Sequence, residues 1–133
     1  RWMEARRNGS EEELKSNYAE RTGVILAGAG ALLEDDHFVY VNGEHGSGWV
    51  DKDVLNTQPH RVSELAAMLA DLVEDWELDW VCGPAIGGIV VAQWVAFHLG
   101  KPNGQFRFRD RHRSPIFEVQ NRDGLAPIPL ATE

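Results

Sequence analysis

The clearest hydrophobic pattern in the chain lies between Gln58 and Trp76. Apolar residues recur there at spacings of three and four, which places them on one face of a helix. The members of this stripe are Val62, Leu65, Ala66, Leu69, Leu72, Val73 and Trp76. Pro59 suits the first turn of the helix, where a missing N–H costs nothing. The pattern therefore predicts an amphipathic helix with this stripe buried.

A strand, a helix and a second strand are predicted after it. Leu78–Cys82 is a short apolar strand, Gly88–Leu99 is an apolar helix ended by a glycine and a proline, and Gln105–Arg109 alternates with period two. Helix, strand, helix and strand in this order form a βαβ unit, which predicts an α/β fold with a partly parallel sheet. Ile116–Val119 is a candidate returning strand. The glycine and prolines in 124–129 disfavour regular structure beyond it.

The N-terminal third predicts a helix and a hairpin. Ser10 and Glu13 have the spacing of a capping box, so a modestly amphipathic helix should run to about Arg21. Apolar residues in 24–33 permit a further helix despite two glycines. His37–Val41 is rich in strand formers, and Asn42-Gly43 is a strong turn pair. With Gly46, Ser47 and Gly48 next, followed by Trp49 and Val50, this predicts a hairpin with a glycine-rich tip.

The segment Val81–Ala92 is the part of this pattern that suggests a ligand-binding site. Its apolar run ends at Gly83-Pro84, and Gly87-Gly88 open an apolar helix. In such a turn the peptide N–H groups are unhindered, and the helix start adds partial positive charge, so a phosphate or pyrophosphate can bind. The alternative is that strand, glycine turn and helix only reverse the chain direction.

The net charge of the chain and its distribution indicate which kinds of ligand the protein can bind. The 133 residues allow one domain, and a formal net charge of -8 argues against a general nucleic-acid binder. The chain begins at Arg1, so we expect that an N-terminal piece precedes it. Four arginines at alternate positions in 107–113, with His112 among them, form a basic segment. This segment suits a small anionic ligand, although a solvated strand face explains it equally.

Other chemistry is not expected. The five histidines show no metal-ligand spacing, and Cys82 ends an apolar run, where a packed thiol is expected rather than a nucleophile. One cysteine fits a reducing, cytoplasmic setting. No apolar run reaches the roughly 18 residues of a membrane span, and 1–16 has no apolar centre of a signal peptide.

Three segments together resemble an orotate phosphoribosyltransferase of the type I phosphoribosyltransferase family. Gly30–His45 is similar to the family's GALL-like helix end, HF strand and SG-x-H turn. Trp49–Lys52 resembles the aromatic-V-D-K continuation, and Gly83–Ile89 matches the G-P-A-x-x-G-I loop. The order and spacing also match, and the resemblance covers about 30–113.

The resemblance implies a fold and a reaction. We expect a single, partial domain over 1–133 of the type I phosphoribosyltransferase-like α/β fold, with a helix and hairpin hood at about 10–55 and a βαβ core at about 56–133. Enzymes of this family transfer phosphoribosyl from phosphoribosyl pyrophosphate (PRPP) to orotate or a related pyrimidine, with Mg²⁺ bound through PRPP. They are commonly homodimers, so a cytoplasmic homodimer is expected.

Site residues are carried over only onto matching positions. For the pyrophosphate of PRPP the resemblance points to Ala85, Ile86, Gly87, Gly88 and Lys52. For the base it points to Gly43, His45 and Trp49. For catalysis it points to Arg109, Arg111 and His112. On sequence alone His45 also suits a solvated turn, Trp49 suits core packing, and Lys52 with Asp51 suits a surface ion pair.

Two departures keep other functions open. The family's strand with two acidic residues and a T-T-G or T-A-G turn, which holds the 5′-phosphate, is absent from these residues, and Gly46 stands where serine is common. A non-catalytic protein that binds a base or nucleotide, or regulates through one, is therefore an alternative. A structural or assembly protein that kept the fold, with its five tryptophans in core and subunit contacts, is another.

Overall fold

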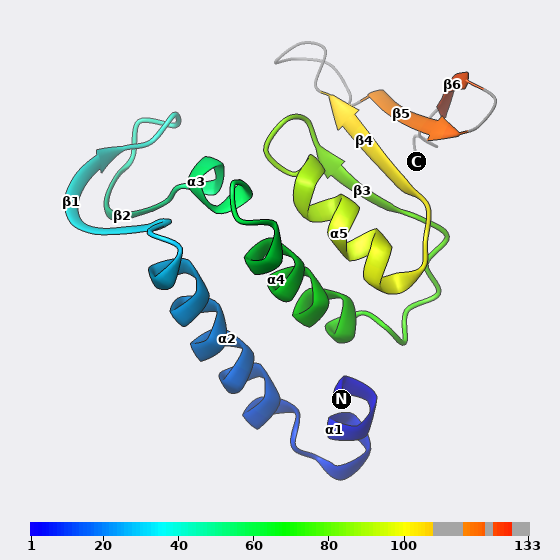
Figure 1. Ribbon diagram of the computed structural model, residues 1–133, viewed down its shortest axis with the longest axis horizontal. Helices are drawn as coiled ribbons and strands as arrows, with labels where there is room; N and C mark the ends of the chain where they lie inside the picture. The colour runs from blue at the N-terminus through cyan, green and yellow to red at the C-terminus, as the bar shows by residue number, and fades with distance from the viewer. Residues whose placement is uncertain (108–115, 122–123, 129–133) are drawn as a thin grey trace. The chain divides into compact units, whose positions relative to one another are not determined.

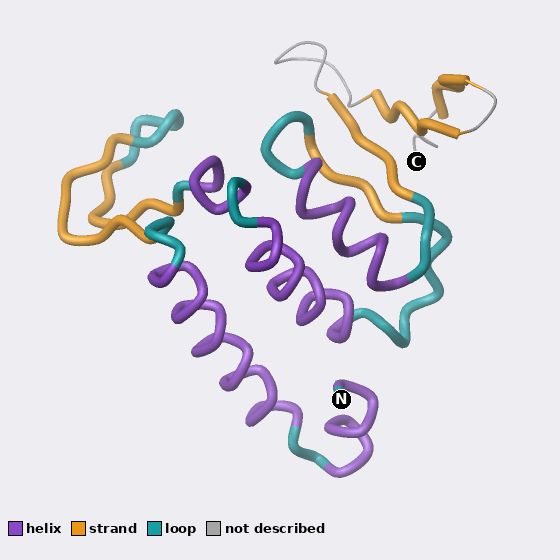
Figure 2. The backbone as a smooth tube through the Cα atoms, in the orientation of Figure 1, coloured by secondary structure: helices purple, strands orange, loops and turns teal. Residues whose placement is uncertain are grey.

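The computed structural model describes residues 1–107, 116–121 and 124–128 (Figure 1). Its elements in chain order are α1 (Trp2–Asn8), α2 (Glu11–Gly28), β1 (Leu32–Val39), β2 (His45–Val50), α3 (Lys52–Asn56), α4 (Pro59–Leu72), β3 (Val81–Pro84), α5 (Ile89–Leu99), β4 (Asn103–Arg107), β5 (Ile116–Asn121) and β6 (Gly124–Ile128) (Figure 2). The chain divides into two compact units, Arg1–Leu65 and Ala66–Glu133. None of the described helices is long and apolar enough to cross a membrane.

The first unit begins with two helices joined by Gly9. The sequence pattern did not predict α1, whose Trp2 and Ala5 are buried. Gly9 ends it with a φ of 76°, in the left-handed region that favours glycine. The second helix begins after Ser10, as expected, but continues to Gly28 rather than ending near Arg21. The apolar residues that permitted a separate helix in 24–33 are therefore divided between α2 and β1.

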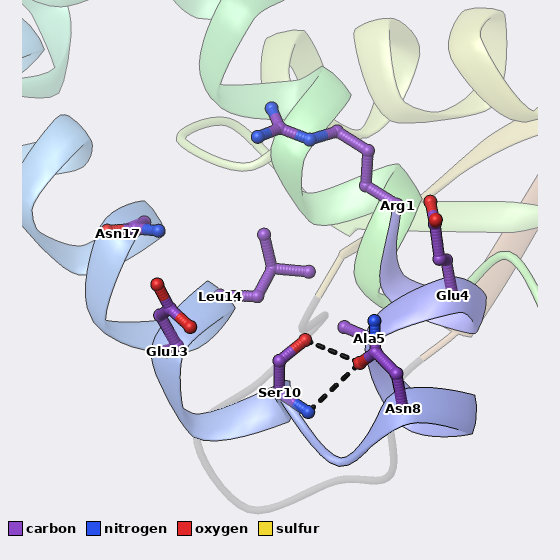
Figure 3. A pocket seen from close by; sticks show the side chains of 8 residues that line it. All are labelled: Arg1, Glu4, Ala5, Asn8, Ser10, Glu13, Leu14 and Asn17. Atoms are coloured by element: carbon purple, nitrogen blue, oxygen red, sulfur yellow. Dashed lines mark hydrogen bonds between the residues drawn. The ribbon is translucent and has the colours of Figure 1, made fainter.

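The predicted capping box at the start of α2 is wrong, because Ser10 does not make the capping hydrogen bond. Ser10 holds the N-cap position, but its side chain makes no cap hydrogen bond. Its hydroxyl donates instead to Asn8 Oδ1 at 2.6 Å, and its backbone N–H donates to the same atom at 3.1 Å (Figure 3). Short polar side chains compete in this way for local donors and acceptors. An open polar cleft of about 240 Å³ lies here, and Ser10, Glu13 and Leu14 are among the residues that line it.

The predicted hairpin is confirmed, with one change at its tip. β1 and β2 pair antiparallel, with Val39 opposite His45 and Leu33 opposite Trp49. The connection is closed by Gly43 N–H, which donates to Tyr40 at 2.9 Å, and Gly43 has a φ of 84°. Gly46 and Gly48 lie within β2 rather than in the tip. Only Gly43 thus serves the turn, at the left-handed position that a three-residue hairpin loop requires.

Side chains from the start of α4 hold the end of α2. Gln58 Nε2 donates to the Ala29 carbonyl at 2.9 Å, and Arg61 Nη1 lies 3.5 Å from the Ile25 carbonyl oxygen. The last carbonyls of a helix lack partners within it and carry partial negative charge, so an amide and a guanidinium are suitable caps. Arg21 Nε also donates to Glu64 Oε1 at 2.6 Å.

The buried face of α4 differs in part from the predicted stripe. Val62 and Ala66 are fully buried, as expected, but Leu69 is 45% exposed and Trp76 is 61% exposed. Trp76 lies beyond the helix, which ends at Leu72. Ala70, outside the predicted stripe, is buried and forms a core cluster with Ala66 and Val95. Packing over the second half of α4 is thus centred on small residues rather than on the large ones.

The second unit contains the predicted βαβ arrangement. β3 and β4 pair parallel, and α5 joins them and packs against both (Figure 1). β5 follows antiparallel to β4, as the returning strand was expected to do, and the strand order is β3-β4-β5-β6. The sheet is therefore partly parallel. Gly100, with a φ of 63°, ends α5 in the left-handed conformation expected at a helix C-terminus.

Regular structure continues where glycine and proline were expected to end it. β6 pairs antiparallel with β5, and Pro127 lies opposite Glu118. Within the described strands β6 is at the edge of the sheet. A proline cannot donate to a ladder, but on an edge strand it can sit where no donor is needed.

Candidate functional site

The turn between β3 and α5 is the best-formed candidate site. The Gly88 N–H donates to the Pro84 carbonyl at 2.8 Å, and the Ile89 N–H donates to the Ile86 carbonyl at 3.2 Å. The Ala85–Ile86 peptide bond is cis. These bonds close a compact loop over 84–88 directly at the start of α5.

Two glycines allow the ends of this loop to meet. An alanine Cβ at Gly83 would fall on the Gly88 carbonyl and 2.8 Å from the Ala92 Cβ. One at Gly88 would collide with the ring of Pro84 and lie 2.9 Å from its nitrogen. Such distances are shorter than real Cβ contacts, so both positions need glycine because neighbouring backbone approaches closely. The loop geometry is thus fixed by residues that do not themselves offer a donor to a ligand.

The donors lie between these glycines. Within the described ranges, no group accepts a hydrogen bond from the amides of Ala85, Ile86 or Gly87. The Ile86 side chain is 82% exposed, and Ala85 and Gly87 are half-buried. Unpartnered amides next to a helix N-terminus form a site of partial positive charge. This part of the chain can therefore bind a small anion through its backbone.

The end of β4 lies at the same edge of the sheet. Pro84 pairs with Phe106, so the carboxyl ends of these two parallel strands are adjacent. Ligands of open α/β sheets bind at this edge. The predicted catalytic residues Arg109, Arg111 and His112 come directly after β4 but fall within 108–115, outside the described residues. Their assignment stays a prediction.

A small cleft runs beside the first turns of α5. It has a volume of about 160 Å³ and is lined by Ile89, Gln93, Asn103, Gly104 and Gln105. The Oδ1 atom of Asn103 is buried and has no hydrogen-bond partner in the described part of the chain. Sequence reasoning did not single out these amide side chains. The one sequence signal that could have identified them is their spacing, because Asn103 and Gln105 are two residues apart on β4.

Cys82 lies two residues before the loop and is partly buried. Burial raises the pKa of its thiol, because the low-dielectric surroundings disfavour the charged thiolate. The thiolate is the reactive form of cysteine, so this environment suppresses nucleophilic chemistry. The expectation of a packed, inert side chain agrees with this arrangement.

The second candidate site is the hairpin, which carries Gly43, His45 and Trp49. His45 Nδ1 lies 2.7 Å from His37 Nε2, and both side chains are exposed. Trp49 is 43% exposed, so it does not serve core packing. Its ring stacks on that of Tyr40, with centroids 6.0 Å apart and an interplanar angle of 25°. The hairpin thus presents an aromatic surface beside a pair of imidazoles.

Tyr40 explains the glycine at position 46. A Cβ on Gly46 would collide with the Tyr40 hydroxyl, and that hydroxyl donates to the Gly48 carbonyl at 2.8 Å. The tyrosine therefore lies across the two glycines of β2 and supports Trp49. Sequence reasoning missed this role, since the spacing of the residues gives no sign that the ring crosses the strand.

Lys52 and Asp51 do not form the expected pair. Asp51 is the N-cap of α3, and its Oδ1 accepts from the Asp53 and Val54 amides at 3.0 and 3.1 Å. Lys52 Nζ lies 3.9 Å from Asp53 Oδ1, and its side chain is 54% exposed. An exposed contact of this length contributes little to stability. The lysine is thus available to a ligand, and Asp51 has a structural role.

The predicted site residues fall into two groups. Gly43, His45, Trp49 and Lys52 belong to the hairpin and the helix that follows it, in the first unit. The loop residues 85–88 belong to the second unit. Among the described residues, no three histidine, cysteine, aspartate or glutamate side chains gather as a metal site.

Known proteins resemble the chain in sequence, although no family model matches it. The orotate phosphoribosyltransferase of Bartonella henselae is 32% identical over 95 residues, which is 64% of this chain and 49% of that enzyme. The orotate phosphoribosyltransferase of Thermotoga maritima is 35% identical over 75 residues, 56% of this chain and 40% of the enzyme. The chain spans about half the length, or less, of the curated relatives it matches.

Solved structures give the same picture. The orotate phosphoribosyltransferase of Aeropyrum pernix is 29% identical with a TM-score of 0.52, over 63% of this chain and 51% of that one. The orotate phosphoribosyltransferase of Mycobacterium tuberculosis is 21% identical with a TM-score of 0.51. The match covers 83% of this chain and 61% of that one, and at this identity it shows the fold alone. Sequence and fold therefore agree that this chain is similar to orotate phosphoribosyltransferases and shares part of their α/β fold.

Proposed function

We propose that the protein transfers phosphoribosyl from PRPP to orotate or a related pyrimidine base, as a glycosyltransferase of nucleotide synthesis or salvage. The observation that carries the proposal is the loop over 84–88, whose three amides without acceptors lie at the start of α5. Relatives named orotate phosphoribosyltransferase support the substrate class. The loop would bind the pyrophosphate of PRPP through the amides of Ala85, Ile86 and Gly87. Gly88 would shape the loop rather than donate to the ligand, because its N–H already donates to the Pro84 carbonyl.

The reaction makes one main demand on the protein. Displacement at the anomeric carbon of ribose has an oxocarbenium-like transition state and releases pyrophosphate, whose growing negative charge must be stabilised. The loop amides supply fixed dipoles for this charge. Arg109 and Arg111 would add charged, bidentate donors, and His112 would add a further donor, if the residues that follow β4 reach the pyrophosphate. The carboxyl end of β4 pairs with that of β3, from which the loop starts. Lys52 is proposed as a further contact to PRPP.

The hairpin would contact the base. Exposed Trp49, supported by Tyr40, offers a flat surface on which a pyrimidine can stack. His45 offers a ring nitrogen for a hydrogen bond, and Gly43 at the turn leaves the tip open. These assignments rest on the proposed function.

Mg²⁺ is proposed to bind through the oxygens of PRPP. Magnesium is commonly held by substrate phosphates with few protein ligands. When bound, the ion would neutralise part of the pyrophosphate charge. We also propose a cytoplasmic homodimer, which sedimentation velocity of the purified chain would test.

A second function is favoured by one observation. These 133 residues contain no strand followed by two acidic residues and a T-T-G or T-A-G turn, the family's element for the 5′-phosphate. A protein that lacks this element altogether would bind a base or nucleotide without transferring phosphoribosyl. A structural or assembly role is the third possibility, and it predicts no ligand response.

One assay separates these functions. Orotate, PRPP and Mg²⁺ are mixed with the purified chain, and orotate consumption is followed by absorbance while pyrophosphate release is measured in parallel. Transfer predicts equal amounts of both. Binding without transfer predicts a higher melting temperature with orotate or PRPP and no consumption. No consumption and no thermal shift at millimolar ligand would contradict both.

A further inference from the structure

Two histidines on the hairpin have ring nitrogens that face each other. His45 lies opposite Val39 in the β1–β2 pair, two residues along β1 from His37. Their rings have centroids 4.8 Å apart at an interplanar angle of 40°, and His37 Nε2 is 2.7 Å from His45 Nδ1. His37 itself lies in the β-bulge between Glu34 and Phe38, which also holds Asp35 at a φ of 60°. Bulges of this kind re-aim side chains.

The distance between the nitrogens fits a shared metal ion. Imidazole nitrogens bind divalent transition metals at about 2.0–2.1 Å, so two ligands at a right angle are about 2.9 Å apart. A tetrahedral angle would need roughly 3.3 Å. The observed 2.7 Å is closer to the right-angled arrangement of Ni²⁺ or Cu²⁺. To aim at one ion instead of at each other, the two rings would each have to turn by roughly 45°. Both side chains are exposed, which leaves room for this rotation.

The charge around the pair also favours a cation. Four acidic residues, Glu34, Asp35, Asp36 and Glu44, lie within 34–45. No lysine or arginine occurs between Thr22 and Asp51. Such a one-signed segment attracts counter-ions. No third side-chain ligand gathers at the pair among the described residues, so water would complete the coordination.

We propose that His37 Nε2 and His45 Nδ1 form a two-histidine site for Ni²⁺ or Cu²⁺ on the exposed face of the hairpin. Both imidazoles ligate as neutral rings, with the His37 proton on Nδ1 and the His45 proton on Nε2. The ion replaces the hydrogen bond between the rings. This site is distinct from the Mg²⁺ that PRPP would carry, because it uses nitrogen ligands.

Calorimetric titration of Ni²⁺ tests the proposal. The untagged 133-residue chain is dialysed against EDTA and then into a non-coordinating buffer. One saturable site per chain is expected, at least tenfold weaker in both His37→Gln and His45→Gln. His60→Gln and His98→Gln are matched controls at exposed histidines and should keep the affinity. No saturable binding, binding unchanged by the hairpin variants, or an equal loss in the controls would overturn the proposal.

A second measurement needs no substitution. Paramagnetic Cu²⁺ added at low molar ratio to the ¹⁵N-labelled chain should broaden the amide signals of His37 and His45 first. Broadening centred on another histidine or on the N-terminus would overturn the proposal even if the variants misfolded. Neither measurement uses PRPP or orotate, so its failure would leave the proposed transferase function untouched.

Discussion

At the scale of single residues, the loop over 84–88 depends on two kinds of residue. Some offer backbone amide donors, and others let neighbouring backbone segments approach closely. Gly83 and Gly88 permit the close approach, while Ala85, Ile86 and Gly87 keep their amides without acceptors. The exposed Ile86 side chain contributes neither packing nor a donor. The side chain can therefore be replaced with little cost to the fold, whereas the Ile86 carbonyl accepts from the Ile89 N–H and must be kept.

Ile86→Pro removes one amide donor and is expected to weaken pyrophosphate binding. A hydrogen bond to a charged group contributes about 1.5–3 kcal/mol, so the dissociation constant should rise by roughly 10–150-fold. Ile86→Ala keeps the amide and should bind like the unsubstituted chain. Calorimetric titration with pyrophosphate and Mg²⁺ measures both. Equal affinity in the proline and alanine variants would contradict a role for this amide.

Cys82 predicts a pH dependence of thiol reactivity. Because burial raises its pKa, the folded chain should alkylate with iodoacetamide only at higher pH than the same chain in urea. The sign also fixes the linkage: the contribution to folding is full below the unfolded-state pKa and is lost as the pH rises through the folded one. Rate–pH profiles that coincide in buffer and in urea would contradict the burial argument.

The N-cap role of Asp51 predicts how much its side chain contributes to the free energy of unfolding. Asp51→Ala removes the acceptor for two amides of α3 and should lower the free energy of unfolding by about 1 kcal/mol. Asp51→Asn retains a side-chain oxygen and should cost much less. Urea denaturation followed by circular dichroism measures the difference. An alanine variant as stable as the asparagine variant would show that the cap contributes nothing.

At the scale of elements, the glycines along the chain are not equivalent. Gly23, within α2, has open space where a side chain would go, whereas Gly83 faces the Gly88 carbonyl. Gly23→Ala should raise the free energy of unfolding by about 0.5–1 kcal/mol, because alanine favours helix. Gly83→Ala should lower it by about 1–3 kcal/mol through overpacking. Thermal melts of the pair measure both, and effects of the same sign would contradict the contacts described.

Elements with a strong periodic pattern could be predicted from sequence. The βαβ unit followed from apolar runs, a glycine turn and period-two alternation, which are local signals. The length of α2 could not be predicted, because Gly23 and Gly28 weaken a helix that continues nonetheless. Its end is capped by Gln58, directly before α4, and by Arg61 within α4. Long-range caps of this kind leave no pattern in the helix itself.

The candidate site was predictable to a similar degree. The loop over 84–88 was visible because glycine and proline mark it and its family resemblance locates it. The support of Trp49 by Tyr40 and the contact of His37 with His45 were not visible, since they depend on which strand faces meet. The unpartnered Oδ1 of Asn103 was likewise hidden, because burial decides it and sequence does not.

At the scale of the whole molecule, the two candidate sites belong to different compact units. The hairpin surface, with its aromatic stack and imidazole pair, lies in the first, and the anion loop lies in the second. The chain matches about half the length of its curated relative from Bartonella henselae, so transferase activity and binding at the loop are separate questions. Binding at the loop can be tested without that activity.

An NMR titration of the ¹⁵N-labelled chain with pyrophosphate and Mg²⁺ tests most directly whether the loop over 84–88 binds pyrophosphate. We expect saturable shifts of the Ala85, Ile86 and Gly87 amides, with much smaller changes at Gly23 and other amides of α2. Sulfate at the same ionic strength is the control for nonspecific anion effects and should shift the loop amides less. Loop amides that stay unchanged at millimolar pyrophosphate, or that respond equally to sulfate, would contradict a pyrophosphate loop.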